Sequence, residues 1–255
     1  MTTNPSAAHR LIIALDVPTA AEARRIVTTI GDAAVFYKVG KQLFTAEGPQ
    51  IVRDLTSAGK SVFLDLKFHD IPNTVAGAVA EAAKLGVEML TVHASGGGNM
   101  LRAAVSAAVS AAKVTAAKAS TPASSGKTRP GPAILAVTVL TSLADDDLDK
   151  IGIRGQVLEQ VMRLAAIALA DGCHGLVASP HEARQLRNEF RPLYNDFLLV
   201  TPGVRPKGTA TGDQARVLTP AEAVAAGASH IVVGRPITES PDPATAAREI
   251  IQELE

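Results

Sequence analysis

The chain repeats one unit, a short apolar run followed by a longer helical stretch, and this repetition constrains its fold more than any other feature. Most of the runs are continuously apolar and do not alternate with polar residues, which is typical of parallel strands covered on both faces. The Ala-rich stretches between the runs have the length and pattern of helices. The predicted strands span residues 11–16, 35–40, 61–67, 89–93, 133–138, 175–178, 197–201 and 230–234.

Residues that begin and end helices separate the predicted strands. A Ser or Thr followed three residues later by Glu forms a capping box at a helix start. Asp242 before Pro243 is a further start signal, for the last helix. A glycine that adopts a left-handed conformation ends many helices. The capping pairs are Thr19 with Glu22, Ser179 with Glu182 and Thr219 with Glu222, and the terminating glycines are Gly59, Gly86, Gly172 and Gly227.

Eight strand–helix units in about 250 residues predict an α/β protein with a single domain over residues 1–255. The expected fold is a closed (β/α)₈ TIM barrel, because one such barrel needs about 250 residues. An open, doubly wound sheet satisfies the same alternation and is the structural alternative.

Composition narrows the class of protein. Because 25 Lys and Arg balance 25 Asp and Glu, net charge draws the chain neither to nucleic acid nor to anionic membranes. The single cysteine, Cys173, forms no internal disulfide, which fits a reducing compartment. The first residues lack a secretory signal pattern, and no apolar stretch reaches the ~18 residues that span a bilayer. We therefore expect a soluble, cytoplasmic protein.

The stretch 111–132 departs from the repeat. It is rich in Ala, Ser, Lys, Pro and Gly, with Val114 as its one large apolar residue. Its first half is expected to extend the fourth helix, and residues 119–132 to form a mobile surface loop. A basic arm that binds nucleic acid is the alternative, but its four Lys and Arg residues lack aromatic neighbours.

Charged residues lie at the carboxyl ends of the first three predicted strands. Asp65 and Lys67 are two residues apart, so regular strand geometry directs both side chains to the same face. Asp16 ends the first strand, Lys38 lies late in the second, and Asp70 follows the third. Because barrel enzymes carry their active sites at this end of the strands, we expect these charges to meet there.

The alternating signs of these charges carry more information than any one of them. A single strand-end Asp usually caps a helix, and a single Lys there usually faces solvent. Opposite charges ~4 Å apart attract by roughly 4 kcal/mol at an effective dielectric near 20, which offsets part of the cost of burial. The pattern indicates a lattice of Lys and Asp that keeps a lysine charged in a partly closed pocket.

The loops after the seventh and eighth strands have the composition of a phosphate site. Residues 201–208 combine Gly and Pro with Arg205, and Gly234 with Arg235 follows the eighth strand. Glycine allows a phosphate close to backbone N–H groups, and arginine matches its oxygens. Barrels commonly bind phosphate at these two loops. The loop 203–214 is expected to close over the site as a lid.

These motifs together resemble the orotidine 5′-phosphate decarboxylase family. The most specific segment is 65–74, which reads D-L-K-F-H-D-I-P-N-T. The resemblance runs from about residue 11 to 250 and departs at 111–132, where this chain is longer than is usual in the family. Supporting motifs are Leu15-Asp16, Lys38-Val-Gly40, Thr91-Val-His93, Leu140-Thr-Ser142, Thr201-Pro-Gly-Val-Arg205 and Gly234-Arg-Pro236.

The resemblance implies conversion of orotidine 5′-monophosphate to UMP, in pyrimidine nucleotide synthesis, with no metal or organic cofactor. It implies that Lys67 donates a proton within an array of Lys38, Asp65, Lys67 and Asp70. It also implies a homodimer in which Asp70 and Thr74 reach the neighbouring subunit's site. The other implied positions are Asp16 and Lys38 for the ribose, Thr141 for the substrate, Ser142 for the pyrimidine edge, and Arg205, Gln214, Gly234 and Arg235 for the phosphate and lid.

Two alternative functions remain open. A metal-assisted decarboxylase or aldolase acting on sugar phosphates would share the D-x-K-x-x-D core but not the Ile-Pro-Asn-Thr continuation. A non-catalytic phosphometabolite-binding protein is disfavoured, because every expected catalytic position holds a competent residue. His69, His93 and His174 lie near strand ends without metal-ligand spacing. With no Trp and 3% aromatic residues, a bound pyrimidine is expected to meet backbone, Thr, Ser and aliphatic groups.

Overall fold

Eight parallel strands close into one barrel in chain order, with β1 hydrogen-bonded to both β2 and β8. The computed structural model describes residues 6–118, 131–206 and 218–255. Closure confirms the single-domain (β/α)₈ TIM barrel and contradicts an open sheet, because an open sheet would leave two edge strands. The strands are β1 Leu11–Ala14, β2 Phe36–Gly40, β3 Ser61–Phe68, β4 Met89–His93, β5 Ala133–Val137, β6 Gly175–Val177, β7 Leu198–Thr201 and β8 His230–Val233.

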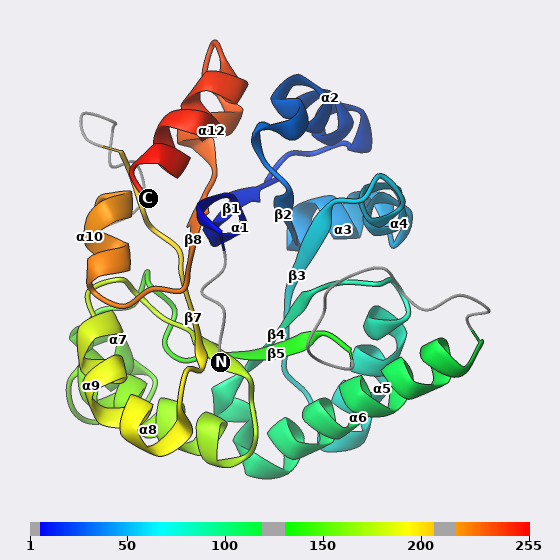
Figure 1. Ribbon diagram of the computed structural model, residues 1–255. Helices are drawn as coiled ribbons and strands as arrows, with labels where there is room; N and C mark the ends of the chain where they lie inside the picture. The colour runs from blue at the N-terminus through cyan, green and yellow to red at the C-terminus, as the bar shows by residue number, and fades with distance from the viewer. Residues whose placement is uncertain (1–5, 119–130, 207–217) are drawn as a thin grey trace.

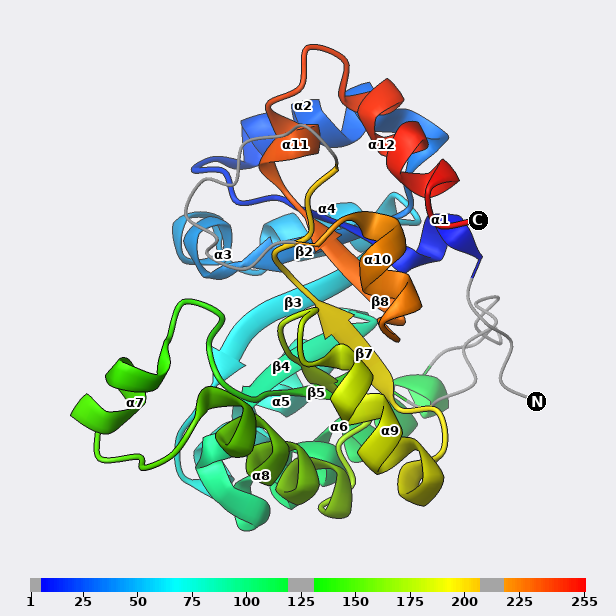
Figure 2. The same cartoon turned by 90° about the vertical axis from the view of Figure 1, so that its left-hand side faces the viewer.

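Helices surround the barrel, and each strand is followed by at least one of them (Figure 1 and Figure 2). The α-helices are α1 Ala7–Arg10, α2 Ala20–Ile30, α3 Lys41–Glu47, α4 Gln50–Ser57, α5 Pro72–Ala83, α6 Gly97–Lys118, α7 Asp145–Lys150, α8 Val157–Ala170, α9 Ala183–Tyr194, α10 Pro220–Ala225, α11 Arg235–Thr238 and α12 Pro243–Gln252. Two 3₁₀ turns are η1 Gly31–Ala33 and η2 Ala94–Gly96. Helix α6 confirms the predicted extension of the fourth helix, whereas the loop expected at 119–132 lies almost entirely outside the described residues.

Three of the four predicted helix starts are confirmed. Thr19 and Thr219 each accept a hydrogen bond from the backbone three residues on, and Asp242 does the same for α12. The start predicted at Ser179 is wrong. Glu182 accepts from the Ser179 backbone N at 2.8 Å, but residues 180–182 form a turn and α9 begins only afterwards. The predicted terminating glycines have positive φ, and they are Gly59, Gly86, Gly172 and Gly227.

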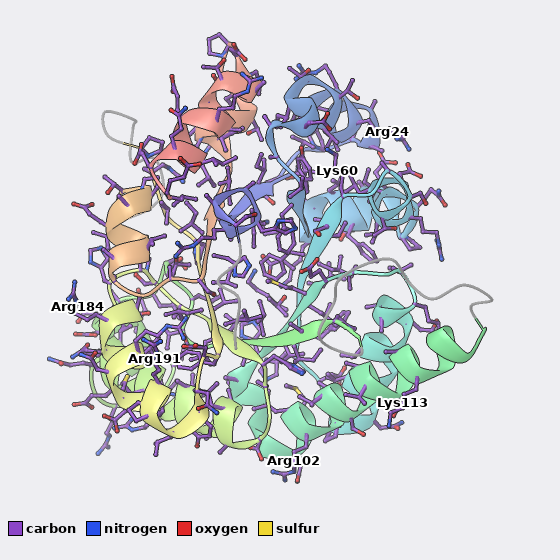
Figure 3. All side chains as sticks on the ribbon, viewed as in Figure 1. Arg24, Lys60, Arg102, Lys113, Arg184 and Arg191 are labelled. Carbon is purple, nitrogen blue, oxygen red and sulfur yellow. The ribbon has the colours of Figure 1, made fainter. Side chains whose placement is uncertain are left out.

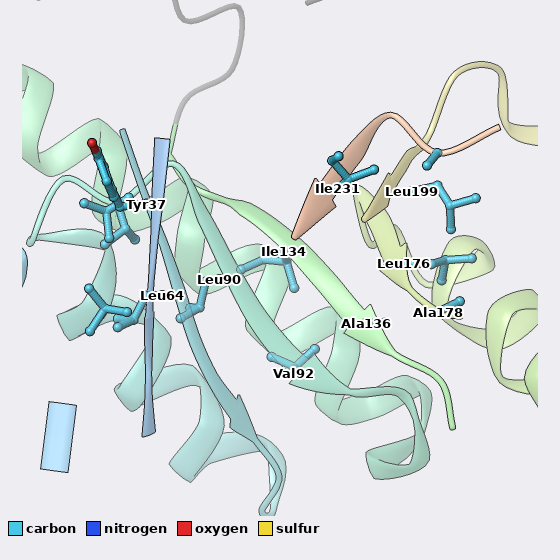
Figure 4. Close-up of a cluster of buried hydrophobic side chains, with 14 of the residues drawn as sticks. Tyr37, Leu64, Leu90, Val92, Ile134, Ala136, Leu176, Ala178, Leu199 and Ile231 are labelled. Atoms are coloured by element: carbon cyan, nitrogen blue, oxygen red, sulfur yellow. The ribbon is translucent and has the colours of Figure 1, made fainter. Parts of the chain in front are cut away.

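Two apolar layers lie on the two faces of the strands. Ile12, Phe36 and Phe63 fill the barrel interior. Their neighbours along the chain face the helices instead, as Tyr37 and Leu64 do in Figure 4. This two-residue alternation explains the continuous apolar runs, since both faces need apolar side chains. Each fully buried side chain of this size contributes about 1.5–3 kcal/mol.

The outer surface carries charged side chains that project from the helices, including Arg24, Arg102 and Arg191 (Figure 3). These three arginine side chains are more than half exposed, and each pairs with an aspartate. Exposed pairs of this kind contribute about 0–1 kcal/mol. Within the described ranges, no helix has the length and hydropathy that crossing a bilayer requires.

Candidate active site

A cavity of about 520 Å³ lies at the carboxyl ends of the strands. Its lining combines apolar side chains with charged and polar groups, which come from the strands and from the segments that follow them. A pocket that combines apolar walls with converging polar groups is typical of sites for small molecules. The lining residues are Ala14, Asp16, Val17, Pro18, Glu22, Lys38, Phe63, Asp65, Lys67, Val137, Val139, Leu140, Thr141, Val177, Pro202, Gly203, Arg205, Val232, Gly234, Arg235, Thr238 and Glu239.

Four charged side chains of alternating sign follow one wall of this cavity. Lys38 Nζ lies 2.7 Å from Asp16 Oδ1 and 3.8 Å from Asp65 Oδ2. Lys67 Nζ lies 2.7 Å from both carboxylate oxygens of Asp65. The side chains of Lys38 and Asp65 are only 10% and 12% exposed, so the centre of the row is shielded from water. The alternation predicted for the first three strands is present, and each buried charge faces an opposite one.

The two-residue period of the strands produces this row. Phe36 and Phe63 point into the barrel interior. Lys38 follows Phe36 by two residues, and Asp65 follows Phe63 by two residues. The side chains of Lys38 and Asp65 therefore point to the same inner face, but at the carboxyl end of the barrel. The sequence thus places apolar side chains inside the barrel and charged side chains at its mouth.

The backbone at Lys67 breaks this period. The pairing of β3 with β4 advances from Leu64 to Phe68 on one strand but only from Leu90 to Val92 on the other, so β3 bulges. Lys67 lies in this bulge with a φ of 53°. That left-handed conformation costs a non-glycine residue about 1–3 kcal/mol. The regular strand geometry predicted for Lys67 is therefore wrong, although its side chain does meet Asp65.

A buried threonine on β4 spans the bulge. Thr91 Oγ1 accepts a hydrogen bond from the Lys67 backbone N at 2.9 Å and donates one to Asp65 Oδ1 at 2.9 Å. Sequence reasoning did not place Thr91 in the site. The available signal was a hydroxyl inside an otherwise apolar strand, because a buried hydroxyl needs a partner.

The surroundings of Asp65 keep its carboxylate charged. Burial by itself would raise the pKa of Asp65. The charges of Lys67 and Lys38, with hydrogen bonds from Lys67 and Thr91, outweigh burial and hold this pKa below its usual value. Asp65 is therefore ionised at neutral pH, and Lys67 faces a permanent anion.

Gly40 makes room for the outer ion pair. A Cβ at this position would lie 2.8 Å from Asp16 Oδ1 and 3.0 Å from Lys38 Nζ, which is closer than side chains normally approach. The last residue of β2 must therefore lack a side chain if this pair is to form as observed. Sequence reasoning quoted Gly40 as part of a motif but assigned it no role.

The segments that follow β7 and β8 hold the groups expected to bind phosphate. Arg205 follows β7 and is 8% exposed, and its Nη1 donates to the Val204 carbonyl at 3.0 Å. Gly234 and Arg235 follow β8 at the start of α11. All of these except Val204 line the cavity, together with Thr141 from the segment after β5.

Other predicted positions lie apart from the cavity. The described residues that line it do not include Asp70, Thr74 or Ser142. Asp70 and Thr74 are exposed, and the Asp70 carboxylate accepts a hydrogen bond from the Ile71 backbone N at 2.6 Å. Gln214 lies outside the described residues, as do residues 207–214 of the expected lid.

The histidine at the end of β4 stands beside the charged row. The rings of His93 and His69 lie 5.3 Å apart. Burial, with the charges of His69, Lys41 and Lys67, lowers the pKa of His93 to about 4, against the opposing charge of Asp65. His93 is therefore neutral near pH 7.

Across the described residues, no three His, Cys, Asp or Glu side chains are grouped in a way that could hold a metal ion.

Comparison with known proteins assigns this site to a family. The model of the orotidine 5′-phosphate decarboxylase / HUMPS family matches residues 9–250. The chain belongs to this family. An orotidine 5′-phosphate decarboxylase from Moorella thermoacetica is 49% identical over 250 residues, which cover 98% of this chain and 93% of the relative. One from Halorhodospira halophila is 49% identical over 245 residues, covering 96% and 95%.

Solved structures of the orotidine 5′-phosphate decarboxylase family share the fold. The crystal structure of the enzyme from Lactobacillus acidophilus superimposes with a TM-score of 0.81 at 39% identity, covering 96% of this chain and 98% of that one. The resemblance seen in the sequence is thereby confirmed. So is the prediction that the chain is an enzyme of the carboxy-lyase class.

Proposed function

We propose that the chain decarboxylates orotidine 5′-monophosphate to UMP without a metal or organic cofactor, and that Lys67 is its proton donor. The observation that carries this proposal is the Lys67 ammonium, bonded to both oxygens of Asp65 on the wall of the cavity. The relatives named as orotidine 5′-phosphate decarboxylases support the same substrate.

The chemical problem is the negative charge that develops at C6 of the orotate ring. When the bond between C6 and its carboxylate breaks, CO₂ departs and the electron pair stays on C6, with no adjacent carbonyl to accept it. An ammonium group beside C6 stabilises this charge electrostatically. Lys67 then donates a proton from Nζ to C6, which forms the C6–H bond of UMP, and takes a replacement proton from water.

Asp65 has two tasks in this scheme. It holds the Lys67 ammonium in place, and its negative charge faces the carboxylate of the bound substrate. Repulsion between the two carboxylates disfavours the bound substrate and is relieved when CO₂ leaves. The lowered pKa of Asp65 supports this role, since only the ionised form repels.

Proton donation alone leaves most of the rate enhancement to be explained. A general acid typically contributes ~10²–10⁴-fold, against total enhancements of about 8–23 kcal/mol. We assign much of the difference to groups that bind the substrate away from C6. These are Asp16 and Lys38 for the ribose, and Arg205, Gln214, Gly234 and Arg235 for the phosphate, with loop 203–214 closing over it.

The pyrimidine ring is assigned to the space between these two regions. Phe63, Val137 and Val177, from β3, β5 and β6, line the cavity. We place Thr141 at the ring and Ser142 at its polar edge. The described lining contains one aromatic side chain, that of Phe63. Aliphatic and polar contacts therefore position the ring in this proposal.

The active form is proposed to be a homodimer with shared sites. Asp70, between β3 and α5, and Thr74, in the first turn of α5, are exposed, and neither lines the cavity of its own chain in the described part of the structure. The apolar side chain of Ile71, between them, is 67% exposed. A second copy seated on this segment would cover Ile71 and bring Asp70 toward the partner's Lys67. We also place the protein in the cytoplasm, where its buried thiol, Cys173, stays reduced.

Turnover of orotidine 5′-monophosphate tests this function directly. We expect absorbance to fall as the purified protein converts it to UMP, at the same rate with and without EDTA. Loss of activity on chelation would favour a metal-assisted relative acting on sugar phosphates. Tight binding of UMP without any turnover would favour a non-catalytic binding protein.

A further inference from the structure

We propose that Thr91 is a positioning residue, whose hydroxyl holds the Asp65 carboxylate and the Lys67 backbone in the arrangement that the reaction uses. This inference rests on the proposed function. Thr91 is not among the described residues that line the cavity. It therefore acts through Asp65 and Lys67 and not by touching the substrate.

The place of Thr91 on β4 makes a hydroxyl unexpected. Met89 faces the barrel interior, whereas Leu90 and Val92 face the helices. Thr91 returns to the inner face and is 0% exposed. An aliphatic side chain would satisfy burial at this point, and a buried hydroxyl is destabilising unless it is hydrogen-bonded. The two hydrogen bonds of Thr91, to Lys67 and Asp65, therefore explain why a hydroxyl occupies this position.

The two bonds fix the direction of the single hydroxyl proton. The Lys67 backbone N–H can only donate, so Thr91 Oγ1 must accept there. Its own proton is then committed to Asp65 Oδ1, at 2.9 Å. A donor aimed at this oxygen favours the ionised carboxylate, because protonation of the same oxygen would set two protons against each other.

The same hydroxyl supports the bulge that carries Lys67. The backbone of Lys67 is left-handed, and its N–H lies where the pairing of β3 with β4 shifts register. Thr91 supplies the acceptor that a regular neighbouring strand would otherwise provide. The Asp65 carboxylate and the Lys67 backbone N–H both hydrogen-bond to Thr91 Oγ1. This shared partner holds the two ends of the bulge together, so that the Lys67 side chain is directed back over Asp65.

Removal of the Thr91 hydroxyl would leave the charged groups around Asp65 in place. Lys67 on β3 and Lys38 on β2 both face the Asp65 carboxylate, and Asp16 lies on the far side of Lys38. His93 lies nearby on β4 and is neutral near pH 7. The carboxylate should therefore stay ionised at neutral pH but protonate at a higher pH than in the unaltered protein.

Four proteins test this role: the wild type, Thr91→Val, Thr91→Ser and Thr138→Val. Valine has the shape of threonine without the hydroxyl, and serine keeps the hydroxyl. Thr138 is the matched control, because it is also buried and its hydroxyl donates to a backbone carbonyl, that of Val177 at 3.2 Å. For each protein, kcat, KM for orotidine 5′-monophosphate, the pH profile of kcat and the thermal midpoint are measured.

The expected result is a large loss of kcat in Thr91→Val, the variant without the hydroxyl, and in no other protein of the set. In Thr91→Val, kcat should fall about 10- to 100-fold while KM changes by less than about threefold. The acid limb of its pH profile should move to higher pH. Thr91→Ser should recover kcat to within about threefold of wild type. Thr138→Val should keep the wild-type kcat and acid limb.

Three outcomes would overturn the role of Thr91. These are wild-type kcat and acid limb in Thr91→Val, an equal loss in Thr138→Val, or a serine variant as impaired as the valine variant. If Thr91→Val does not fold, Thr91→Ala replaces it under the same criteria, because it removes the hydroxyl and leaves more room. A wild-type protein that does not consume orotidine 5′-monophosphate would contradict the proposed function itself, which separates the two failures.

Discussion

Lys67 places its ammonium 2.7 Å from both carboxylate oxygens of Asp65, although its own backbone lies in the left-handed region at a φ of 53°. The conformation that costs backbone energy is the one that brings the two charges together. Strain of this kind persists only where surrounding contacts hold it in place. Here Thr91 and the ion pair itself provide those contacts.

Loss of the Lys67 ammonium should stop the reaction without preventing binding. We expect Lys67→Ala to lower kcat by more than about 10²–10⁴-fold, because it removes both the proton donor and the charge beside C6. UMP binding, followed by calorimetry, should stay measurable. The matched control is Lys84→Ala, on an exposed lysine paired with Glu81, which should keep wild-type activity. Turnover by Lys67→Ala within tenfold of wild type would contradict the assigned role.

Mixing of two inactive variants should restore activity if the site is shared. Asp70→Ala and Lys67→Ala should each be inactive alone. After subunit exchange, one site of each mixed dimer combines an intact Lys67 with an intact Asp70 from the other chain. We expect up to about half of the wild-type activity per mixed dimer. Absence of recovery, with exchange demonstrated by mass spectrometry, would count against the shared site.

A side chain at Gly40 should impair binding more than folding. A Cβ there would meet the ends of two flexible side chains, Asp16 and Lys38, which can move aside at little cost to stability. We expect Gly40→Ala to raise KM by about 10-fold or more while the thermal midpoint changes little.

Gly175→Ala provides the contrast for this experiment. A Cβ at Gly175 would collide with the Leu198 backbone, which cannot move without distorting β7. This variant should lose thermal stability, with KM unchanged in the folded fraction. A Gly40→Ala protein that unfolds early and keeps wild-type KM would contradict the assignment.

The pKa of His93 predicts how stability depends on pH. Burial first, and neighbouring positive charges second, lower this pKa from 6.5 to about 4 in the folded protein. The unfolded chain therefore binds a proton more readily between these values, and the folded state loses stability as pH falls from about 6.5 toward 4.

Replacement of His93 isolates this contribution. We expect the thermal midpoint of wild type to fall over this pH window more steeply than that of His93→Gln, which has no imidazole to protonate. The two proteins should show parallel midpoints above about pH 7. Equal slopes between pH 6.5 and 4 would show that His93 does not drive the change.

Local patterns were sufficient to predict most of the fold. The observed strand ends lie within two residues of the predicted ends, because continuous apolar runs and capping residues act over a few residues. The false helix start at Ser179 shows the limit of such signals. Half of the capping box forms there, through Glu182 and the Ser179 backbone N, yet the helix begins later.

The sequence by itself determined the alternation of strands and helices, and it determined which side chains stand at the carboxyl ends of the strands. Apolar runs, helix caps and the two-residue period of a strand all act over a few residues. Asp16, Lys38 and Asp65 were predictable on that ground. Only the tertiary structure decided how Lys67 reaches Asp65 and which hydroxyl holds them. The register shift between β3 and β4 depends on packing between strands, and Thr91 lies 26 residues from its partner Asp65. No local pattern in one chain segment encodes such a distance.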